Sequence, residues 1–157
     1  MKRAYRIQRR LMEKIAKLER EGIERDTSLD WERIHMVGCA RNGYFLAQKR
    51  KVDAELAVLA CSVHDYGRIV TGKQDNHAAA GFEPLKVFLA ECDYLDADEI
   101  DLIAVAAKNH SNKGAVGTPL DEAVKDADVL DCYQYGIPLR KAEHQRRLKS
   151  LLIEMEL

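Results

Sequence analysis

The stretch Leu56-Ala57-Val58-Leu59-Ala60-Cys61-Ser62-Val63 runs directly into Val63-His64-Asp65-Tyr66-Gly67-Arg68. A helix that is apolar on nearly every side is expected in the middle of a helical bundle, so the imidazole and carboxylate at its end would lie at the core. Burying such ionisable groups costs roughly 2 kcal/mol or more apiece, even with partial pairing. A bound metal cation is the usual compensation for this pair of residue types. We therefore interpret His64 and Asp65 first as metal ligands.

Three further histidines and one late carboxylate extend this hypothesis. His35 precedes the doublet, His77 and His110 follow it, and Asp128 lies on the inward side of a later predicted helix. Each also has a structural explanation. A lone histidine is often a core residue bonded to backbone or a surface residue, a helix-end histidine is stabilised by the helix dipole, and a buried aspartate often pairs with an arginine. Taken together, the set favours metal binding.

The order of a histidine, a histidine-aspartate doublet and a distant aspartate resembles the HD-domain superfamily of metal-dependent phosphohydrolases, over about residues 30–136. The resemblance implies an all-α fold, an HD-domain helical bundle of about six to seven helices. It also implies a first metal ion bound by His35, His64, Asp65 and Asp128. Some members, including cyclic-dinucleotide phosphodiesterases and bacterial diadenosine tetraphosphate hydrolases, bind a second ion through two added histidines. His77 and His110 occupy those places, and Asp65 would then bridge both ions.

Two departures from the family pattern bear on the substrate. Many members carry Gly-Lys after the doublet, whereas this chain has Gly67-Arg68. The positive charge is kept, but a planar guanidinium group replaces the compact ammonium group of lysine. The Gly-Tyr-Pro-type loop that marks the cyclic-di-GMP enzymes has no match near the doublet. That subfamily is therefore disfavoured.

Length and composition fit one globular domain. The 157 residues are 46% hydrophobic and 32% charged, with a formal net charge of -1. We expect a single HD-type helical domain over 1–157, whose core of about 30–136 is flanked by an N-terminal and a C-terminal helix. The balanced charge disfavours nucleic acid as a partner. Without a signal region, a stretch of ~20 apolar residues or a C-x-x-C pair, a cytoplasmic protein with no membrane association is expected.

Local signals predict where the helices begin and end. An amphipathic helix is expected over residues 2–21, with apolar residues at steps of three and four and Gly22 as its stop. We expect a loop between Arg68 and Asn76, and a short helical piece at His77 with a break near Gly81 to Pro84. Helix caps are expected at four further places: Thr27–Asp30, Asp53, Asp96 and Thr118.

The last predicted helix begins at Leu139, after Gly136-Ile137-Pro138. His144 lies among the charges of this helix and is expected at the surface. The apolar end of the helix, Leu151-Leu152-Ile153, would cover the core or pair with another subunit. Asp131 is a lesser site candidate, as a group that orients a ligand or faces substrate, and Asp126 is another.

The favoured function is hydrolysis of a small phosphorylated substrate, foremost a nucleotide. Histidine nitrogens with few carboxylates suit one or two divalent Fe, Mn, Co, Ni or Zn ions better than Mg. A metal-activated water would attack phosphorus, Asp65 would orient that water, and Arg68 would neutralise charge on the phosphate oxygens. With two ions the water would lie between them. With one ion, His77 and His110 would contact phosphate or donate the leaving-group proton.

Two alternatives stay open at this point. A diiron HD-type oxygenase would keep the same ligands but cleave a carbon bond with dioxygen. A non-catalytic regulatory domain would retain the histidines for structure, or bind a metal or ligand without turnover.

Overall fold

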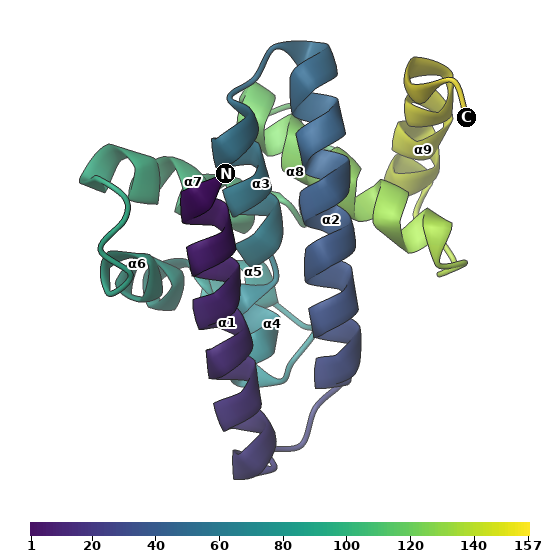
Figure 1. The fold of residues 1–157 in the computed structure, drawn as a ribbon. Helices are drawn as coiled ribbons and strands as arrows, with labels where there is room; N and C mark the ends of the chain where they lie inside the picture. The colour runs from purple at the N-terminus through teal and green to yellow at the C-terminus, as the bar shows by residue number, and fades with distance from the viewer.

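The computed structural model describes all residues, 1–157, and they form nine helical segments and no strand (Figure 1). The predicted all-α bundle is confirmed. Seven segments have nine or more residues, as many helices as expected, and α4 and α5 are the two short ones. The segments are α1 (Lys2–Glu21), α2 (Leu29–Arg50), α3 (Ala54–Val63), α4 (Tyr66–Thr71), α5 (His77–Ala80), α6 (Phe82–Ala90), α7 (Ala97–Asn109), α8 (Pro119–Gln134) and α9 (Ala142–Met155).

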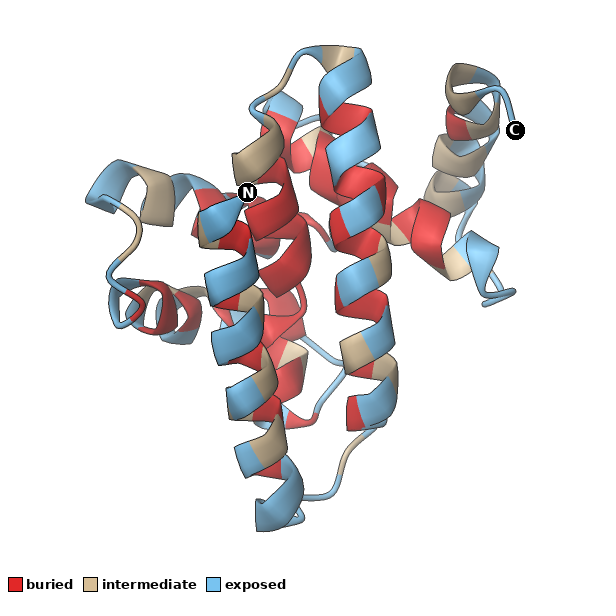
Figure 2. Ribbon diagram, viewed as in Figure 1, coloured by how far each residue is buried: buried red, intermediate tan, exposed pale blue.

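Helix α3 is the centre of the bundle. Every residue from Ala57 to Val63 is buried, and Figure 2 shows this helix buried along most of its length. It packs mainly against α2, with further contacts to α7, α8 and α1. Because its side chains are apolar all round, only a central position removes them from water. The C-terminal end of α3 therefore carries His64 and Asp65 into the interior.

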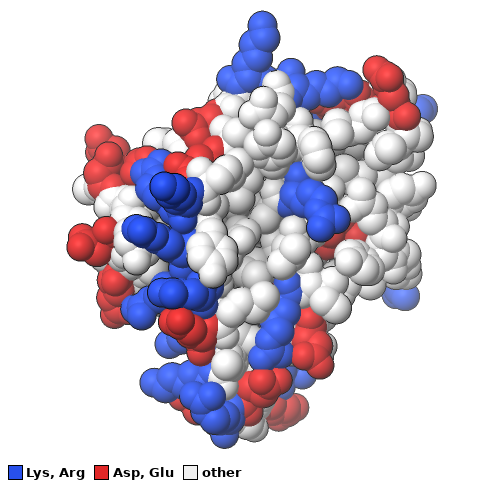
Figure 3. All heavy atoms as spheres, in the orientation of Figure 1, with Lys and Arg blue, Asp and Glu red and all other residues white.

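Helix α1 covers one side of α3. Its buried apolar residues fall at the predicted steps of three and four: Ile7, Leu11, Ile15 and Leu18. Gly22 ends the helix in the left-handed conformation, with φ of 65°, which glycine adopts without steric cost. Figure 3 shows Lys and Arg intermingled with Asp and Glu along the side of the molecule that carries α1.

Capping residues start four helices at the predicted places. Ser28 and Asp53 accept hydrogen bonds from the amides of Trp31 and Leu56, and each such cap stabilises a helix by about 1 kcal/mol. Asp96 and Thr118 go further, because each forms a reciprocal capping box at the start of α7 or α8. These caps fix the helices that carry His35, His64, His110 and Asp128.

The loop expected between Arg68 and Asn76 is wrong in its first half. Helix α4 continues through Thr71, and only Gly72 to Asn76 is non-helical before α5. Composition suggested a loop, but Ile69 is buried in the core and the Thr71 hydroxyl donates to the carbonyl of Gly67. Burial therefore overrides the weak helix preference of these residues.

Two glycines allow α4 to lie against α5 and the start of α6. A Cβ atom on Gly67 would lie 1.9 Å from the carbonyl oxygen of His77, and one on Gly81 would lie 2.7 Å from the Cα atom of Gly67. The contact is thus backbone against backbone. It brings His77 beside the doublet, and the predicted short helix at His77 with a break at Gly81 is confirmed.

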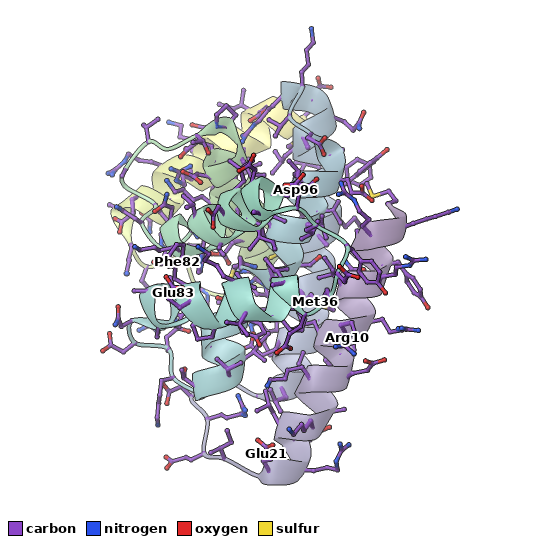
Figure 4. All side chains as sticks on the ribbon, turned by 90° about the vertical axis from the view of Figure 1, so that its left-hand side faces the viewer. Arg10, Glu21, Met36, Phe82, Glu83 and Asp96 are labelled. Carbon is purple, nitrogen blue, oxygen red and sulfur yellow. The ribbon has the colours of Figure 1, made fainter.

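The remaining helices enclose the bundle. In Figure 4, Phe82 and Glu83 lie at one end of α6, and Asp96 lies above it at the start of α7. Helix α9 begins at Ala142 rather than at Leu139, and it packs on α8 through the buried Leu151. None of the helices has both the length and the apolar character needed to span a bilayer.

Candidate metal centre

Four imidazoles share one hydrogen-bonding arrangement. In each ring Nδ1 lies within hydrogen-bonding distance of an oxygen acceptor, so Nε2 is the nitrogen that faces the centre. Such an arrangement is typical of metal-binding histidines, because it fixes both the tautomer and the ring orientation. The contacts are His35 to Asp131 Oδ2 at 2.6 Å, His64 to Cys61 O at 2.8 Å, His77 to Gln74 O at 2.7 Å and His110 to Ala107 O at 2.5 Å.

The Asp65 carboxylate lies between two pairs of these rings. Its Oδ2 atom is 3.4 Å from Nε2 of His35 and 3.2 Å from Nε2 of His64. Its Oδ1 atom is 3.0 Å from Nε2 of His77 and 3.3 Å from Nε2 of His110. Each carboxylate oxygen therefore contacts its own pair of histidines, and the ligand atoms of His64, Asp65 and His110 also lie within 4.8 Å of one another.

Asp128 completes the group around His35 and His64. Its Oδ1 atom is 3.2 Å from Nε2 of His35 and 4.0 Å from Nε2 of His64. The thiol of Cys39 is also close enough to share an ion with these three side chains. Burial raises the pKa of this thiol above its ordinary value, so it stays protonated and is a poorer ligand than the carboxylate.

Both carboxylates are ionised in this buried setting. Burial alone would raise the pKa of Asp65, but His64 and Arg68 outweigh burial and hold that pKa well below its usual range. Burial opposes ionisation of Asp128 as well, and the ammonium of Lys113 and the ring of His35 lower its pKa. Carboxylate oxygens close to the Nε2 atoms of several imidazoles form a donor set that suits a transition metal.

Unpaired atoms at the centre fit a bound cation. His64 Nε2 and Asp65 Oδ1 are buried and make no hydrogen bond, which would cost about 1–3 kcal/mol for each group without a partner. The Nε2 atoms of His77 and His110 face each other at 3.1 Å. Burial lowers the pKa of His110 to about 4, so its ring is neutral. Metal ions bound by these atoms would satisfy all of them.

Arg68 lies on the wall of the site, with its guanidinium already bonded. It donates to both oxygens of Glu32, at 2.6 and 3.1 Å, to Gln74 at 2.9 Å, and to Asp65 Oδ2. Glu32 is a buried carboxylate that sequence reasoning missed. Its position three residues before His35, on the same face of α2, was the available signal. Arg68 is therefore bonded to both Glu32 and Asp65, and it holds the Asp65 carboxylate in place.

Lys113 is a second residue that sequence reasoning missed. Its side chain is buried, and its ammonium bonds to Asp128 Oδ2 and, at 2.7 Å, to the carbonyl oxygen of His110. The segment after His110 was interpreted only as the end of a helix. Lys113, in the connection between α7 and α8, is thus the cationic partner of Asp128. The sequence had suggested an arginine from another helix as the alternative to a metal ion.

Asp131 and Asp126, the lesser candidates, have different surroundings. Asp131 is fully buried and bonds to Nδ1 of His35, so it orients that ring. Asp126 pairs instead with Arg50 and Arg147, each at 2.8 Å. Trp31 stacks on the ring of His35 at a centroid distance of 5.1 Å, and this contact covers one face of the imidazole.

The centre opens into a pocket of about 180 Å³. A neighbouring cleft of about 570 Å³ shares part of its lining, including Gln74, Ser111 and Lys141. His144, expected among the surface charges of α9, is partly buried and lies on the pocket wall. The position of His144 relative to the site depends on how α9 packs against the bundle, and the charged residues around it do not predict that packing.

The segment that contains the centre matches a known protein family. The family model described as HD domain matches residues 33–135. The match begins in α2 and ends just after α8, so it includes all six of the histidines and aspartates gathered at the centre, and it leaves out α1 and α9. No curated protein and no solved structure matches the chain.

Proposed function

The chain belongs to the HD-domain family, and from this membership we propose that it is a metal-dependent phosphohydrolase acting on a nucleotide or a related phosphate ester. The observation that carries the proposal is the position of Asp65 between two pairs of histidines. HD domains bind divalent metals, and a carboxylate with one oxygen on each side suits the bridging position of a two-ion site.

The ligand sets differ on the two sides of Asp65. On one side we assign His35, His64 and Asp128 to a first ion, and on the other His77 and His110 to a second. Because nitrogen donors predominate, Fe, Mn, Co, Ni or Zn fits better than Mg. Bound there, such ions polarise a phosphate and lower the pKa of water toward neutrality.

The residues of the chain have separate tasks in this reaction. Asp131 and three backbone carbonyls keep the protons of the four histidines on Nδ1. Arg68 and Glu32 fix the Asp65 carboxylate, which orients both the ligand cluster and the attacking water. Lys113, at the pocket wall, adds positive charge near the phosphate oxygens, where negative charge builds up in the transition state.

The experiment is metal analysis followed by an activity panel. Purified protein loaded with Mn, Fe, Co or Ni is tested on nucleotides, cyclic nucleotides, dinucleoside polyphosphates and sugar phosphates. We expect hydrolysis that is lost in Asp65→Asn and retained in Asp98→Asn, an exposed aspartate of α7 with no ion pair. Metal-replete protein that hydrolyses none of them would contradict the proposal and favour a binding domain. Product formation that requires dioxygen would favour an oxygenase.

A further inference from the structure

Four basic or imidazole groups from outside the ligand set line the pocket: Arg68, Lys113, Lys141 and His144. The first two are bonded to carboxylates, Arg68 to Glu32 and Asp65, and Lys113 to Asp128. The side chains of Lys141 and His144 make neither a hydrogen bond nor an ion pair within the chain. They are therefore the two groups of the wall whose donors are available to a ligand.

Both residues stand at the beginning of α9. Lys141 is the residue before the first helical position, and no side chain caps the helix there. The amides of His144 and Gln145 bond back to the carbonyl of Lys141, so the first turn is formed but its leading amides lack a side-chain acceptor. The start of a 14-residue helix carries partial positive charge that attracts an anion.

The ligand cluster forms another wall of the same pocket. Asp65, His77, His110 and Asp128 line it, and Asp65 Oδ1 is a buried oxygen without a hydrogen bond. A volume of about 180 Å³ is about six times the ~30 Å³ that one water takes up in the liquid, so a phosphate group fits between the walls. An anion there would contact both walls at once.

We propose that Lys141 and His144 bind the phosphate group of the substrate in the pocket that they line together with the metal ligands. This proposal rests on the proposed phosphohydrolase function and deepens it. The two residues lie beyond the segment 33–135 that matches the family, so this wall belongs to the C-terminal helix of this chain. Lys141 supplies a charge and His144 a ring N–H, and both act on phosphate oxygens rather than on the metal.

The test is calorimetric titration of inorganic phosphate into the manganese-loaded full-length chain. We expect Lys141→Ala to raise the Kd for phosphate about tenfold and His144→Asn about fivefold, as for loss of a charge-assisted or neutral hydrogen bond. The Kd of Lys141→Arg for phosphate should stay close to that of the original chain. Lys149→Ala is the matched control, because Lys149 lies on the same helix, carries the same charge and lines no pocket that includes the ligand cluster.

Manganese content and melting temperature are measured on every variant, since a change in either would indicate a lost site or a damaged fold. Equal Kd values for Lys141→Ala and Lys149→Ala, or no phosphate binding by the metal-loaded original chain, would overturn the proposal. If phosphate binding depends on Lys141 but no ester is hydrolysed, the phosphohydrolase function is contradicted and phosphate binding by Lys141 and His144 is supported. If the chain hydrolyses an ester and Lys141→Ala does not change the KM, phosphate binding by Lys141 is contradicted and the phosphohydrolase function is supported.

Discussion

The Nε2 atoms of His77 and His110 lie 3.1 Å apart, while Nδ1 of each ring contacts a backbone carbonyl oxygen. Two Nε2 atoms at this distance share either a proton or a metal ion. Asp65 Oδ1 is directed at the same two atoms. This relationship, more than any single residue, supports a second ion beside the one expected at His35, His64 and Asp128.

Removing one of these rings should remove one ion and leave the other. In His110→Asn we expect the metal content to fall from two ions per chain to one, because the ligands on the other side of Asp65 are untouched. Elemental analysis after gel filtration measures this directly. His144→Asn serves as the control and should keep both ions. Two ions retained in His110→Asn would show that the second site has other ligands.

Metal loading should stabilise the fold. A ligand present at about 100 times its Kd adds about 2.7 kcal/mol, and for a chain of this size that corresponds to a rise in Tm of roughly 5–10 °C. We expect the rise on adding Mn²⁺ to chelator-treated protein, measured by differential scanning calorimetry. Asp65→Asn should show a much smaller rise. Equal rises in both proteins would mean that the stabilising ion binds elsewhere.

The close approach of α4 and α5 should tolerate no side chain at Gly67. A Cβ there would meet the backbone of His77 at 1.9 Å and of Gly81 at 2.8 Å, and overpacking of this kind costs typically about 1–3 kcal/mol or more. We expect Gly67→Ala to lower the free energy of unfolding by at least that amount and to weaken binding of the second ion through His77.

Gly114→Ala is the matched control for this substitution, since a Cβ on Gly114 meets nothing within 4 Å. Urea unfolding curves of both variants give the comparison. If the two substitutions prove equally mild, the backbone contact between α4 and α5 is not as close as described.

Acid should weaken the connection between α8 and α9. Partial burial alone would raise the pKa of Glu122, but bonds from Arg147, Lys125 and the Gly117 amide outweigh it and lower the pKa to about 2. A depressed folded-state pKa means that Glu122 stabilises the fold above its unfolded value of 4.5, and that this stabilisation is lost as the pH falls toward 2.

Glu122→Gln should therefore be less stable than the original chain at pH 7, by about 1–2 kcal/mol once solvent screening of this partly exposed group is allowed for. The difference should shrink as the pH falls from 5 to 2. Glu13→Gln, which removes an exposed carboxylate of α1, should show little difference at any pH. A gap between the Glu122 curves that stays constant with pH would contradict the assigned pKa.

The neighbouring cleft of about 570 Å³ should discriminate poorly between nucleobases. Its lining contains carboxylates, amides, a hydroxyl, two alanines and the ammonium of Lys141, with no aromatic side chain besides His77. Stacking on an aromatic ring contributes about 1–3 kcal/mol per base, and this cleft offers little of it. We expect kcat/KM for adenosine, guanosine, cytidine and uridine phosphates of the same type to agree within about threefold. A preference of a hundredfold for one base would require a contact that this cleft lacks.

Sequence reasoning was most successful where the controlling interactions are local. Ser28, Asp53, Asp96 and Thr118 each satisfy amides within the next three residues, so their helix starts could be predicted from neighbours alone. The central position of α3 followed from its apolar composition. In both cases the physical cause lies within one segment of the chain.

The errors and omissions concern contacts between distant segments. Glu32 is buried because Arg68, 36 residues later, bonds to it, and Lys113 is buried because α8 brings Asp128 to it. His144 reaches the pocket only through the packing of α9. Apart from the position of Glu32 on the same face of α2 as His35, no local pattern distinguishes these charged side chains from ordinary surface residues, so their roles became visible only in the folded chain.

The central claim is that Asp65 lies between two metal ions. Anomalous diffraction from crystals grown with Mn²⁺ tests it most directly. The account predicts two anomalous peaks on opposite sides of the Asp65 carboxylate, one next to His35, His64 and Asp128 and the other next to His77 and His110. A single peak that leaves His77 and His110 without metal, or no peak at this centre, would contradict it.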